Sequence, residues 1–181
     1  MKRLVILDRD GVINHDSAKF IKSPTEWKPI PGSLDAIARL NQAGFNVVVA
    51  TNQSGVARGL FDMATLNSIN DKMLDMVFQA GGRIDAVFYC PHAAEQECAC
   101  RKPNAGLFLE IAQRYNVSLG GVPAVGDSLR DLQAADAVGA QPMLVLTGKG
   151  EKTNKNNDLP NGTLVFADLA EAVKHIIAEA P

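Results

Sequence analysis

The chain has 181 residues, 46% of them hydrophobic, which is enough for one domain with a full core and too few for two. Its 18 basic and 20 acidic residues give a formal net charge of -2, so it lacks the overall positive field that holds polymeric nucleic acid. The first apolar run stops at Asp8, and no later run could cross a bilayer. We therefore expect residues 1–181 to form a single cytoplasmic domain without a nucleic-acid or membrane partner, and nothing in the sequence requires more than a monomer.

Apolar runs rich in β-branched residues alternate with segments of helical spacing along the whole chain. The predicted order is strand 3–7, helix 33–43, strand 46–51, helix 63–80, strand 86–90, helix 104–115, strand 122–126, helix 129–138, strand 142–146, strand 163–166 and helix 169–178. Gly44, Gly81 and Gly139 follow helices and suit left-handed C-caps. The polar segment 148–162 is expected to be a solvated surface loop. This alternation predicts an α/β fold with a doubly wound parallel sheet, whose ligands bind beyond the carboxyl ends of the strands.

The first strand ends in two carboxylates. Asp8 and Asp10 are two positions apart, so their side chains point the same way from an extended chain and repel each other unless a cation lies between them. A Mg²⁺ ion, which takes oxygen ligands, would relieve that repulsion and leave one carboxylate oxygen free to attack phosphorus. The alternative is a pair of acids that cap a helix or a turn.

The second strand is followed by small polar residues that could surround a phosphate group. Thr51, Asn52, Gln53 and Ser54 precede Gly55, and their hydroxyl, amide and backbone N–H groups would form a neutral cradle for phosphate oxygens. Residues of these types are also ordinary in loops, so the pattern is weak when taken alone.

All three cysteines of the chain lie in the segment 90–100. Cys90, His92, Cys98 and Cys100 form two Cys-X-His/Cys pairs, which supply the three thiolates and one imidazole of a closed tetrahedral zinc site. A disulfide framework would spread its cysteines along the chain. We expect a structural Zn²⁺ in this loop, and the alternative is three unrelated buried cysteines and a surface histidine.

Two cations, Arg101 and Lys102, follow this loop directly. A fixed ammonium can balance the charge of the attacking carboxylate and the phosphoryl group, while a guanidinium can hold a second anionic group by a two-pronged contact. A metal that folds the loop would fix both cations in place. The alternative is two solvated cations before a helix.

The fourth strand ends in Gly126-Asp127-Ser128-Leu129-Arg130-Asp131. Asp127 lies where an acid would complete a metal site, and Asp131, one helical turn later, can orient metal-bound waters or the lysine. The alternative is a helix cap followed by a surface acid. Because each of the four polar motifs follows a strand of one sheet, we expect them to converge in space.

With these four motifs in this order, the sequence resembles the haloacid dehalogenase superfamily of phosphotransferases across almost its whole length. The family signature Asp-X-Asp-Gly-[Thr/Val] is matched from Asp8 onward. The resemblance implies that Asp8 is the nucleophile and that Asp10 protonates the leaving alkoxide and then activates water, with Asp8 ionised and Asp10 protonated at the first step. It also implies that Thr51 and Lys102 hold the phosphoryl group. Asp127 would hold Mg²⁺ together with Asp8 and the backbone carbonyl of Asp10.

The spacing of the motifs leaves no room for an inserted cap domain, so the site is expected to be open. A capless phosphatase with such a zinc loop is similar to the group that contains the heptose-bisphosphate phosphatases and the histidinol-phosphate phosphatases. Segments 51–59, which includes Arg58, and 98–103 are more similar to the heptose enzymes. This implies hydrolysis of the 7-phosphate of D-glycero-D-manno-heptose 1,7-bisphosphate, on the path to the lipopolysaccharide-core heptose precursor of a Gram-negative bacterium.

The sequence departs from the heptose enzymes in two places. In the loop after the first motif those enzymes carry Asp-His-Gly-Tyr, where this chain has Asp16-Ser17-Ala18-Lys19, and Ser128 replaces a lysine. Asp16 remains a candidate substrate contact. The departures leave the catalytic interpretation intact and leave the exact sugar and its anomer open.

Several alternatives stay open at this point. Histidinol phosphate or a broader set of sugar phosphates would use the same chemistry, and an enzyme acting on nucleic-acid 3′-phosphate ends would need a basic groove. A phospho-receiver signalling domain also phosphorylates an aspartate, but it is not expected to carry the Asp-X-Asp pair or a zinc loop. His15 could contact substrate or be plain polar surface, and Trp27 is expected to pack the chain that leads into the first helix.

Overall fold

Consecutive apolar residues form strands here because helices cover the sheet on both sides. The structure, a computed structural model, describes residues 3–156 and 158–180. The strands are β1 (Arg3–Leu7), β2 (Phe45–Asn52), β3 (Ala86–Cys90), β4 (Pro123–Gly126), β5 (Gln141–Val145) and β6 (Leu164–Phe166). They form one parallel sheet in the order β3-β2-β1-β4-β5-β6. The order reverses between β1 and β4, so a crevice opens beyond the carboxyl ends of these two strands.

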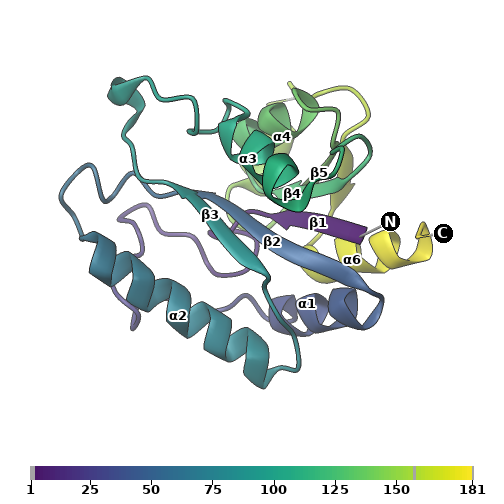
Figure 1. Ribbon diagram of the computed structural model, residues 1–181, viewed down its shortest axis with the longest axis horizontal. Helices are drawn as coiled ribbons and strands as arrows, with labels where there is room; N and C mark the ends of the chain where they lie inside the picture. Colours follow the sequence, from purple (N-terminus) through teal and green to yellow (C-terminus); the bar gives the residue numbers. More distant parts are fainter. Residues whose placement is uncertain (1–2, 157, 181) are drawn as a thin grey trace.

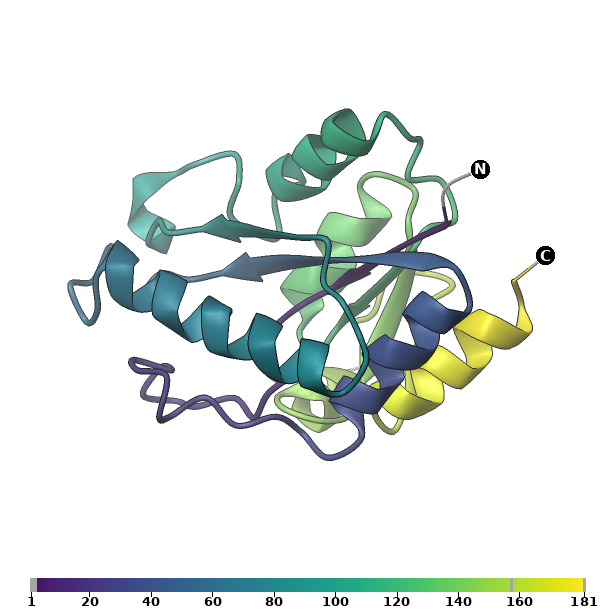
Figure 2. The same cartoon turned by 60° about the horizontal axis from the view of Figure 1, so that its bottom comes forward.

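The helices lie in two layers (Figure 1). α1 (Ser33–Gln42), α2 (Met63–Gln79) and α6 (Leu169–Ala178) cover one face of the sheet, and α3 (Gly106–Tyr115) and α4 (Leu129–Asp136) cover the other. α1 and α6 lie side by side (Figure 2). Each of these helices turns a stripe of buried apolar residues toward the sheet, such as Leu107 and Ile111 of α3. The core is therefore a pair of apolar layers with the sheet between them.

The long connection from β1 to α1 packs onto the middle of α2. Trp27 is completely buried, which confirms the structural role expected for it. The Lys72 ammonium of α2 donates hydrogen bonds to the backbone carbonyls of Pro24, at 2.7 Å, and Trp27, at 2.9 Å. This loop is thereby held against α2.

The predicted order of strands and helices is confirmed, with element ends that differ by no more than two residues. Gly44, Gly81 and Gly139 have the positive φ angles expected after helices. α3 begins at Gly106 because the preceding residues form turns, in which the Asn104 N–H donates to the Arg101 carbonyl and the Gly106 N–H to the Ala99 carbonyl. β6 forms an edge of the sheet, and its Val165 is 40% exposed.

The prediction that segment 148–162 is a solvated loop is wrong in its first part. α5 (Gly150–Lys155) forms there, and Gly150 and Thr153 are buried. The Thr153 hydroxyl donates to the backbone carbonyls of Asp127, at 2.9 Å, and Lys149, at 3.1 Å. A contact with the end of β4 thus stabilises a helix whose polar sequence gives no apolar stripe. Asn157 lies outside the described residues.

No cap domain covers the crevice in the described residues, as expected. The segment between β3 and α3 contains only loops and one short 3-10 turn, Ala94–Gln96. Within 3–156 and 158–180, no helix has the length and apolar character needed to cross a membrane.

The two apolar layers predict unequal effects of two leucine substitutions on one helix. Leu107 of α3 is 1% exposed, whereas Leu109, two positions later, is 59% exposed. Leu107→Ala should lower the free energy of unfolding by about 2–5 kcal/mol, because it removes buried methyl groups and leaves a cavity. Leu109→Ala is the matched control and should change it by less than about 0.5 kcal/mol. Urea unfolding followed by circular dichroism measures both, and equal effects would contradict this packing.

Candidate active site

A cavity of about 310 Å³ lies beyond the carboxyl ends of the central strands. Its wall contains every residue that the sequence suggested for catalysis, Mg²⁺ or substrate: Asp8, Asp10, Asp16, Thr51, Asn52, Gln53, Ser54, Arg58, Arg101, Lys102, Asp127 and Asp131. His15 is exposed and is not part of this wall. The convergence expected from the sheet topology is therefore present.

Lys102 is a buried cation between two aspartates. Its ammonium lies 3.0 Å from Asp8 Oδ1 and 2.6 Å from Asp131 Oδ1, and it donates to the Ala50 carbonyl at 2.7 Å. Burial by itself would lower the pKa of Lys102, but the charges of Asp131 and Asp8 outweigh it and raise that pKa. Burial alone would raise the pKa of Asp131, but the charge and hydrogen bond of Lys102 and the hydrogen bonds from Ser128 lower it. Lys102 and Asp131 thus form a charged pair beside Asp8.

Asp131 also fixes the start of α4. Its Oδ2 atom accepts hydrogen bonds from the backbone N–H of Ser128, at 3.0 Å, and from the Ser128 hydroxyl, at 2.7 Å. This capping box leaves the other carboxylate oxygen for Lys102. Asp131 is therefore a buried residue that orients the lysine, and the alternative of a surface helical acid is wrong.

Asp8 and Asp127 could hold a metal ion, with Asp131 close to both but already bonded to Lys102 and Ser128. One carboxylate oxygen of each lies within 4.8 Å of the others. Burial and the neighbouring acids raise the pKa of Asp127 to about 8, and burial, opposed by Lys102, raises the pKa of Asp8 to about 6. The negative charges of the ionised carboxylates therefore repel each other. A cation with oxygen preference, such as Mg²⁺, fits this donor set because it would offset the repulsion.

Two glycines allow the backbone to approach Asp127 closely. Gly11 and Gly148 have positive φ angles, and a Cβ atom on either would overlap the Asp127 carboxylate. The backbone N–H of Lys149 donates to Asp127 Oδ2 at 2.8 Å, and the Thr147 hydroxyl donates to the Gly11 carbonyl at 2.6 Å. Chain segments that follow β1 and β5 thus fix the orientation of the Asp127 carboxylate.

Side-chain donors surround the Asp10 carboxylate. Arg9 donates from Nε and Nη2, at 3.0–3.2 Å, and the amides of Asn14 and Gln53 each donate at 2.8 Å. Burial alone would raise the pKa of Asp10, but the charge of Arg9 and these hydrogen bonds lower it. We expected Asp10 to be the protonated acid and Asp8 the ionised one. With protein groups alone around them the pKa shifts run in the opposite direction, because burial raises the pKa of Asp8 and the charge of Arg9, which we did not anticipate, lowers the pKa of Asp10.

The polar residues at the end of β2 and directly after it line the cavity and also form hydrogen bonds to neighbouring residues of the site. Gln53 Nε2 donates to Thr51 Oγ1 at 2.9 Å, which links Thr51 to the Asp10 network. The Asn52 side chain exchanges two hydrogen bonds with the Lys102 backbone, at 3.0 and 3.1 Å. Thr51 and Gln53 are almost fully buried and Ser54 is 8% exposed. This segment therefore fixes Lys102 and Asp10 in addition to facing the cavity.

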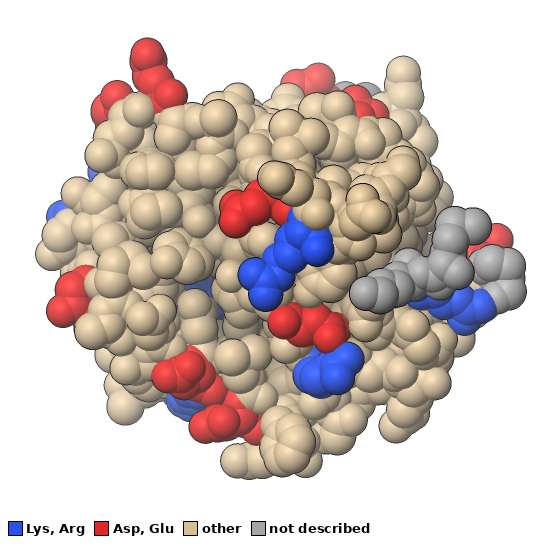
Figure 3. All heavy atoms as spheres, in the orientation of Figure 1, with Lys and Arg blue, Asp and Glu red and all other residues tan. Residues whose placement is uncertain are grey.

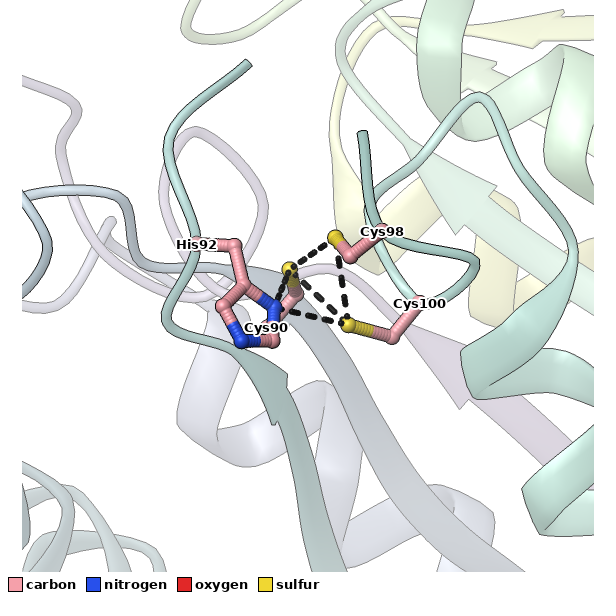
Figure 4. A group of neighbouring side chains, drawn as sticks. All are labelled: Cys90, His92, Cys98 and Cys100. Atoms are coloured by element: carbon pink, nitrogen blue, oxygen red, sulfur yellow. Dashed lines mark hydrogen bonds between the residues drawn. The ribbon is translucent and has the colours of Figure 1, made fainter. Parts of the chain in front are cut away.

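The side chains of the cysteine–histidine cluster (Cys90, His92, Cys98 and Cys100) point toward one another (Figure 4), and Arg101 of the cavity wall follows Cys100 directly. The three sulfur atoms are 3.1–3.5 Å apart, and His92 Nδ1 lies 3.3 Å from Cys100 and 3.6 Å from Cys90. A disulfide needs sulfurs about 2.05 Å apart, so these are free thiols. Four ligand atoms at these separations could hold Zn²⁺, since tetrahedral zinc with bonds of about 2.3 Å places sulfurs slightly less than 4 Å apart.

One hydrogen bond and two ion pairs at the rim connect the loops. The Arg101 guanidinium donates to the His92 carbonyl at 3.2 Å, Arg58 lies 3.8 Å from Glu95, and Lys149 lies 2.9 Å from Asp16. The first two join the cavity to the segment that carries the cysteine–histidine cluster. The third joins the loop after β1 to the segment after β5.

Several residues of the site were not found from the sequence. Arg9, Asn14 and Asn70 belong to the Asp10 network, and no motif marks them, apart from the place of Arg9 between the two aspartates. Lys149 lines the cavity and follows β5, so the rule that ligands bind beyond strand ends could have identified it. Ser17, Ala18, Phe20, Ile21, Ser128 and Arg130 also line the cavity.

Comparisons with known proteins agree with this geometry. The HAD-hydrolase-like family matches residues 99–172. The D-glycero-β-D-manno-heptose-1,7-bisphosphate 7-phosphatases of Bordetella bronchiseptica and Pseudomonas aeruginosa are 60% and 50% identical, over 98% and 97% of this chain and 99% and 98% of theirs. The Escherichia coli enzyme of the same name is 36% identical over 94% of this chain and 93% of its own.

Two solved structures have the same fold. The D,D-heptose 1,7-bisphosphate phosphatase from B. bronchiseptica, complexed with magnesium and phosphate, superposes with a TM-score of 0.97, at 60% identity over 98% of this chain and 99% of that one. The Burkholderia thailandensis phosphatase of that name gives a TM-score of 0.79, at 50% identity over 98% and 100%. The chain thus belongs to the haloacid dehalogenase superfamily and, within it, to the family of the heptose-1,7-bisphosphate 7-phosphatases.

Proposed function

We propose that the protein hydrolyses the 7-phosphate of D-glycero-D-manno-heptose 1,7-bisphosphate, with Asp8 as the nucleophile. The observation that carries the proposal is the 60% identity, over nearly the whole of both chains, to a phosphatase of that specificity. The convergence of Asp8, Asp10, Lys102 and Asp127 in one cavity supports the chemistry.

In the first step, a carboxylate oxygen of Asp8 attacks phosphorus and the bond between phosphorus and the sugar oxygen breaks. Lys102 lies 3.0 Å from Asp8 and offsets negative charge on the nucleophile and the phosphoryl group. Asp10 must carry a proton at this step, although the donors around it favour its ionised form, and it gives that proton to the leaving sugar oxygen, so the sugar departs as an alcohol. Mg²⁺ held by Asp8, Asp127 and the backbone carbonyl of Asp10, when bound, would supply positive charge for the phosphoryl oxygens.

In the second step, water attacks the phosphorus of the aspartyl phosphate. Asp10, now ionised, accepts a proton from this water, and inorganic phosphate leaves as the Asp8 carboxylate is restored. The donors around Asp10 favour its ionised form, which suits the acceptor role. Thr51, Asn52, Gln53 and Ser54 face the phosphoryl group from the cavity wall.

The cysteine–histidine cluster has a structural part in this proposal. With Zn²⁺ bound, it would hold residues 90–100, and the Arg101 guanidinium bonds directly to the His92 carbonyl of that loop. Arg101, Arg58 and Asp16 then remain at the rim of the cavity to contact the rest of the sugar phosphate.

The setting of this activity follows from the proposed substrate. We place the protein in the cytoplasm as a single-domain monomer, 1–181, acting on a small phosphorylated sugar in the supply of heptose for the lipopolysaccharide core. On the face drawn in Figure 3, basic and acidic side chains lie scattered among uncharged ones without a continuous basic groove. The formal net charge of -2 favours a small substrate over a nucleic-acid end.

The proposed specificity predicts a clear order of substrates. The purified protein with Mg²⁺ should have a kcat/KM for heptose 1,7-bisphosphate at least about tenfold above that for histidinol phosphate, because the rim carries cations for a second anionic group. Phosphate release measured with both substrates tests this. A preference for histidinol phosphate would overturn the heptose assignment while leaving the phosphatase chemistry intact.

Asp8→Asn should abolish turnover, because an amide oxygen is a poor nucleophile toward phosphorus. We expect kcat to fall by at least about a thousandfold, with a circular dichroism spectrum like that of the wild type. Asp71→Asn, which changes an exposed aspartate on α2, is the matched control and should keep full activity. Substantial turnover by Asp8→Asn would refute a covalent intermediate on this residue.

Cys98→Ser should weaken the metal cluster and the substrate site together. The free energy of unfolding should fall by about 2 kcal/mol or more, because metal binding to the folded cluster stabilises the fold, and KM should rise because Arg101 loses its support. Metal analysis and thermal unfolding with and without a zinc chelator measure this. The chelator should lower the Tm of the wild type and leave the variant unchanged; a wild type without bound zinc would contradict the prediction.

A further inference from the structure

Arg9 lies between the two aspartates of the first motif, but its side chain points away from the cavity. It is completely buried and is absent from the cavity wall. Its guanidinium reaches Asp10 on one side, with Nη2 3.0 Å from Asp10 Oδ2. On the other side Nη1 donates to Asn70 Oδ1 at 3.1 Å. The guanidinium therefore connects α2, which carries Asn70, to the carboxylate of Asp10.

Within the described residues, few other groups could replace the contact of Arg9 with Asp10. A buried guanidinium is unfavourable unless its donors are satisfied, and the one carboxylate paired with Arg9 is Asp10. Asn70, 7% exposed, occupies Nη1 and so orients the fork toward Asp10. Without Asn70, the guanidinium could rotate, and the Asp10 carboxylate would follow it.

Asn14 and Gln53 complete the arrangement without replacing Arg9. Asn14 comes from the loop after β1 and donates to Asp10 Oδ1, and Gln53 follows β2 and donates to Asp10 Oδ2. Both are neutral amides with one contact each to this carboxylate. Arg9 touches both oxygens, so it alone among these donors defines the plane of the carboxylate.

We propose that Arg9, anchored by Asn70 of α2, is a positioning residue that aims Asp10 at the leaving oxygen of the substrate. The inference rests on the proposed function in one respect, that Asp10 delivers the proton when the phosphorus–oxygen bond breaks. Arg9 does not touch substrate in this role. Its effect reaches the reaction only through the geometry of Asp10, where small displacements slow proton transfer.

A role in proton delivery has a signature that a purely structural role lacks. A sugar alkoxide is strongly basic and leaves slowly unless it is protonated, whereas p-nitrophenolate is weakly basic and leaves without a proton. Misplacing Asp10 should therefore slow the formation of the aspartyl phosphate from a sugar phosphate far more than from p-nitrophenyl phosphate. Loss of folded protein would lower both rates equally.

The test compares Asn70→Ala with Asn67→Ala, which removes the same side chain from an exposed position of α2. Single-turnover rates of phosphoryl transfer are measured with heptose 1,7-bisphosphate and with p-nitrophenyl phosphate. We expect Asn70→Ala to lower the sugar-phosphate rate by roughly tenfold or more and the aryl-phosphate rate by less than about twofold. Asn67→Ala should change neither rate. Asp10→Asn should show the same selectivity in a more extreme form.

Two further variants keep the inference open to refutation. Asn70→Asp restores an acceptor for Arg9 Nη1 and should recover the ratio of the two rates, and Arg9→Lys, which keeps the charge but loses the fork, should reproduce the defect of Asn70→Ala. Equal losses on both substrates, or no loss on either, would overturn the proposal. If heptose bisphosphate is not hydrolysed but another alkyl phosphate is, the proposed specificity fails, and the same ratio measured with that ester still tests Arg9.

Discussion

The site is built around an imbalance of buried charge. Four carboxylates, those of Asp8, Asp10, Asp127 and Asp131, meet at the ends of two adjacent strands, and the two most buried cations beside them are already paired. Lys102 is shared by Asp8 and Asp131, and Arg9 is taken by Asp10. Asp127 is left with a backbone N–H donor, and its pKa rises to about 8. A cation beside Asp127 and Asp8 is thus what the local electrostatics lack, and a divalent ion meets that need without a further basic side chain.

Short backbone contacts keep this arrangement from relaxing. Gly11 and Gly148 bring main chain against the Asp127 carboxylate, where any side chain would collide with it. Asn52 bonds both the N–H and the carbonyl of Lys102, and the lysine follows directly on the segment that carries the cysteine–histidine cluster. The acids therefore cannot separate to reduce their repulsion, which can be lowered instead by protonation, as the raised pKa of Asp127 indicates, or by a bound cation.

The motifs and the fold could be predicted because each depends on local sequence. Strand runs, helix stripes and the position of an acid after a strand are visible within a few residues, and parallel topology brings the strand ends together. The role of Arg9 could not be predicted in this way, because it depends on a contact with Asn70, which lies 61 positions away. Asn70 is on α2, and the sequence pattern of that helix shows only a stripe of core residues. α5 also escaped prediction, since the contact of Thr153 with the Asp127 carbonyl is tertiary. Burial raises the pKa of Asp8, and the Arg9 charge with the amides of Asn14 and Gln53 lowers the pKa of Asp10, so the pKa order is the reverse of the one we expected.

The described residues include no cap over the site, so the selectivity of the site must come from its rim. The rim carries exposed pairs, Lys149 with Asp16 and Arg58 with Glu95, whose side chains are 19–73% exposed. Exposed pairs of this kind stabilise a fold by about 1 kcal/mol or less, so an anionic group of the substrate can replace either acid at little cost. The buried pairs of Lys102 and Arg9 cannot be exchanged so easily, since breaking them would leave a charge without a partner away from water. For this reason we expect that catalysis and substrate selectivity can be changed separately. The buried charges fix the reacting groups, whereas the contacts of the exposed cations can change with the sugar that is bound.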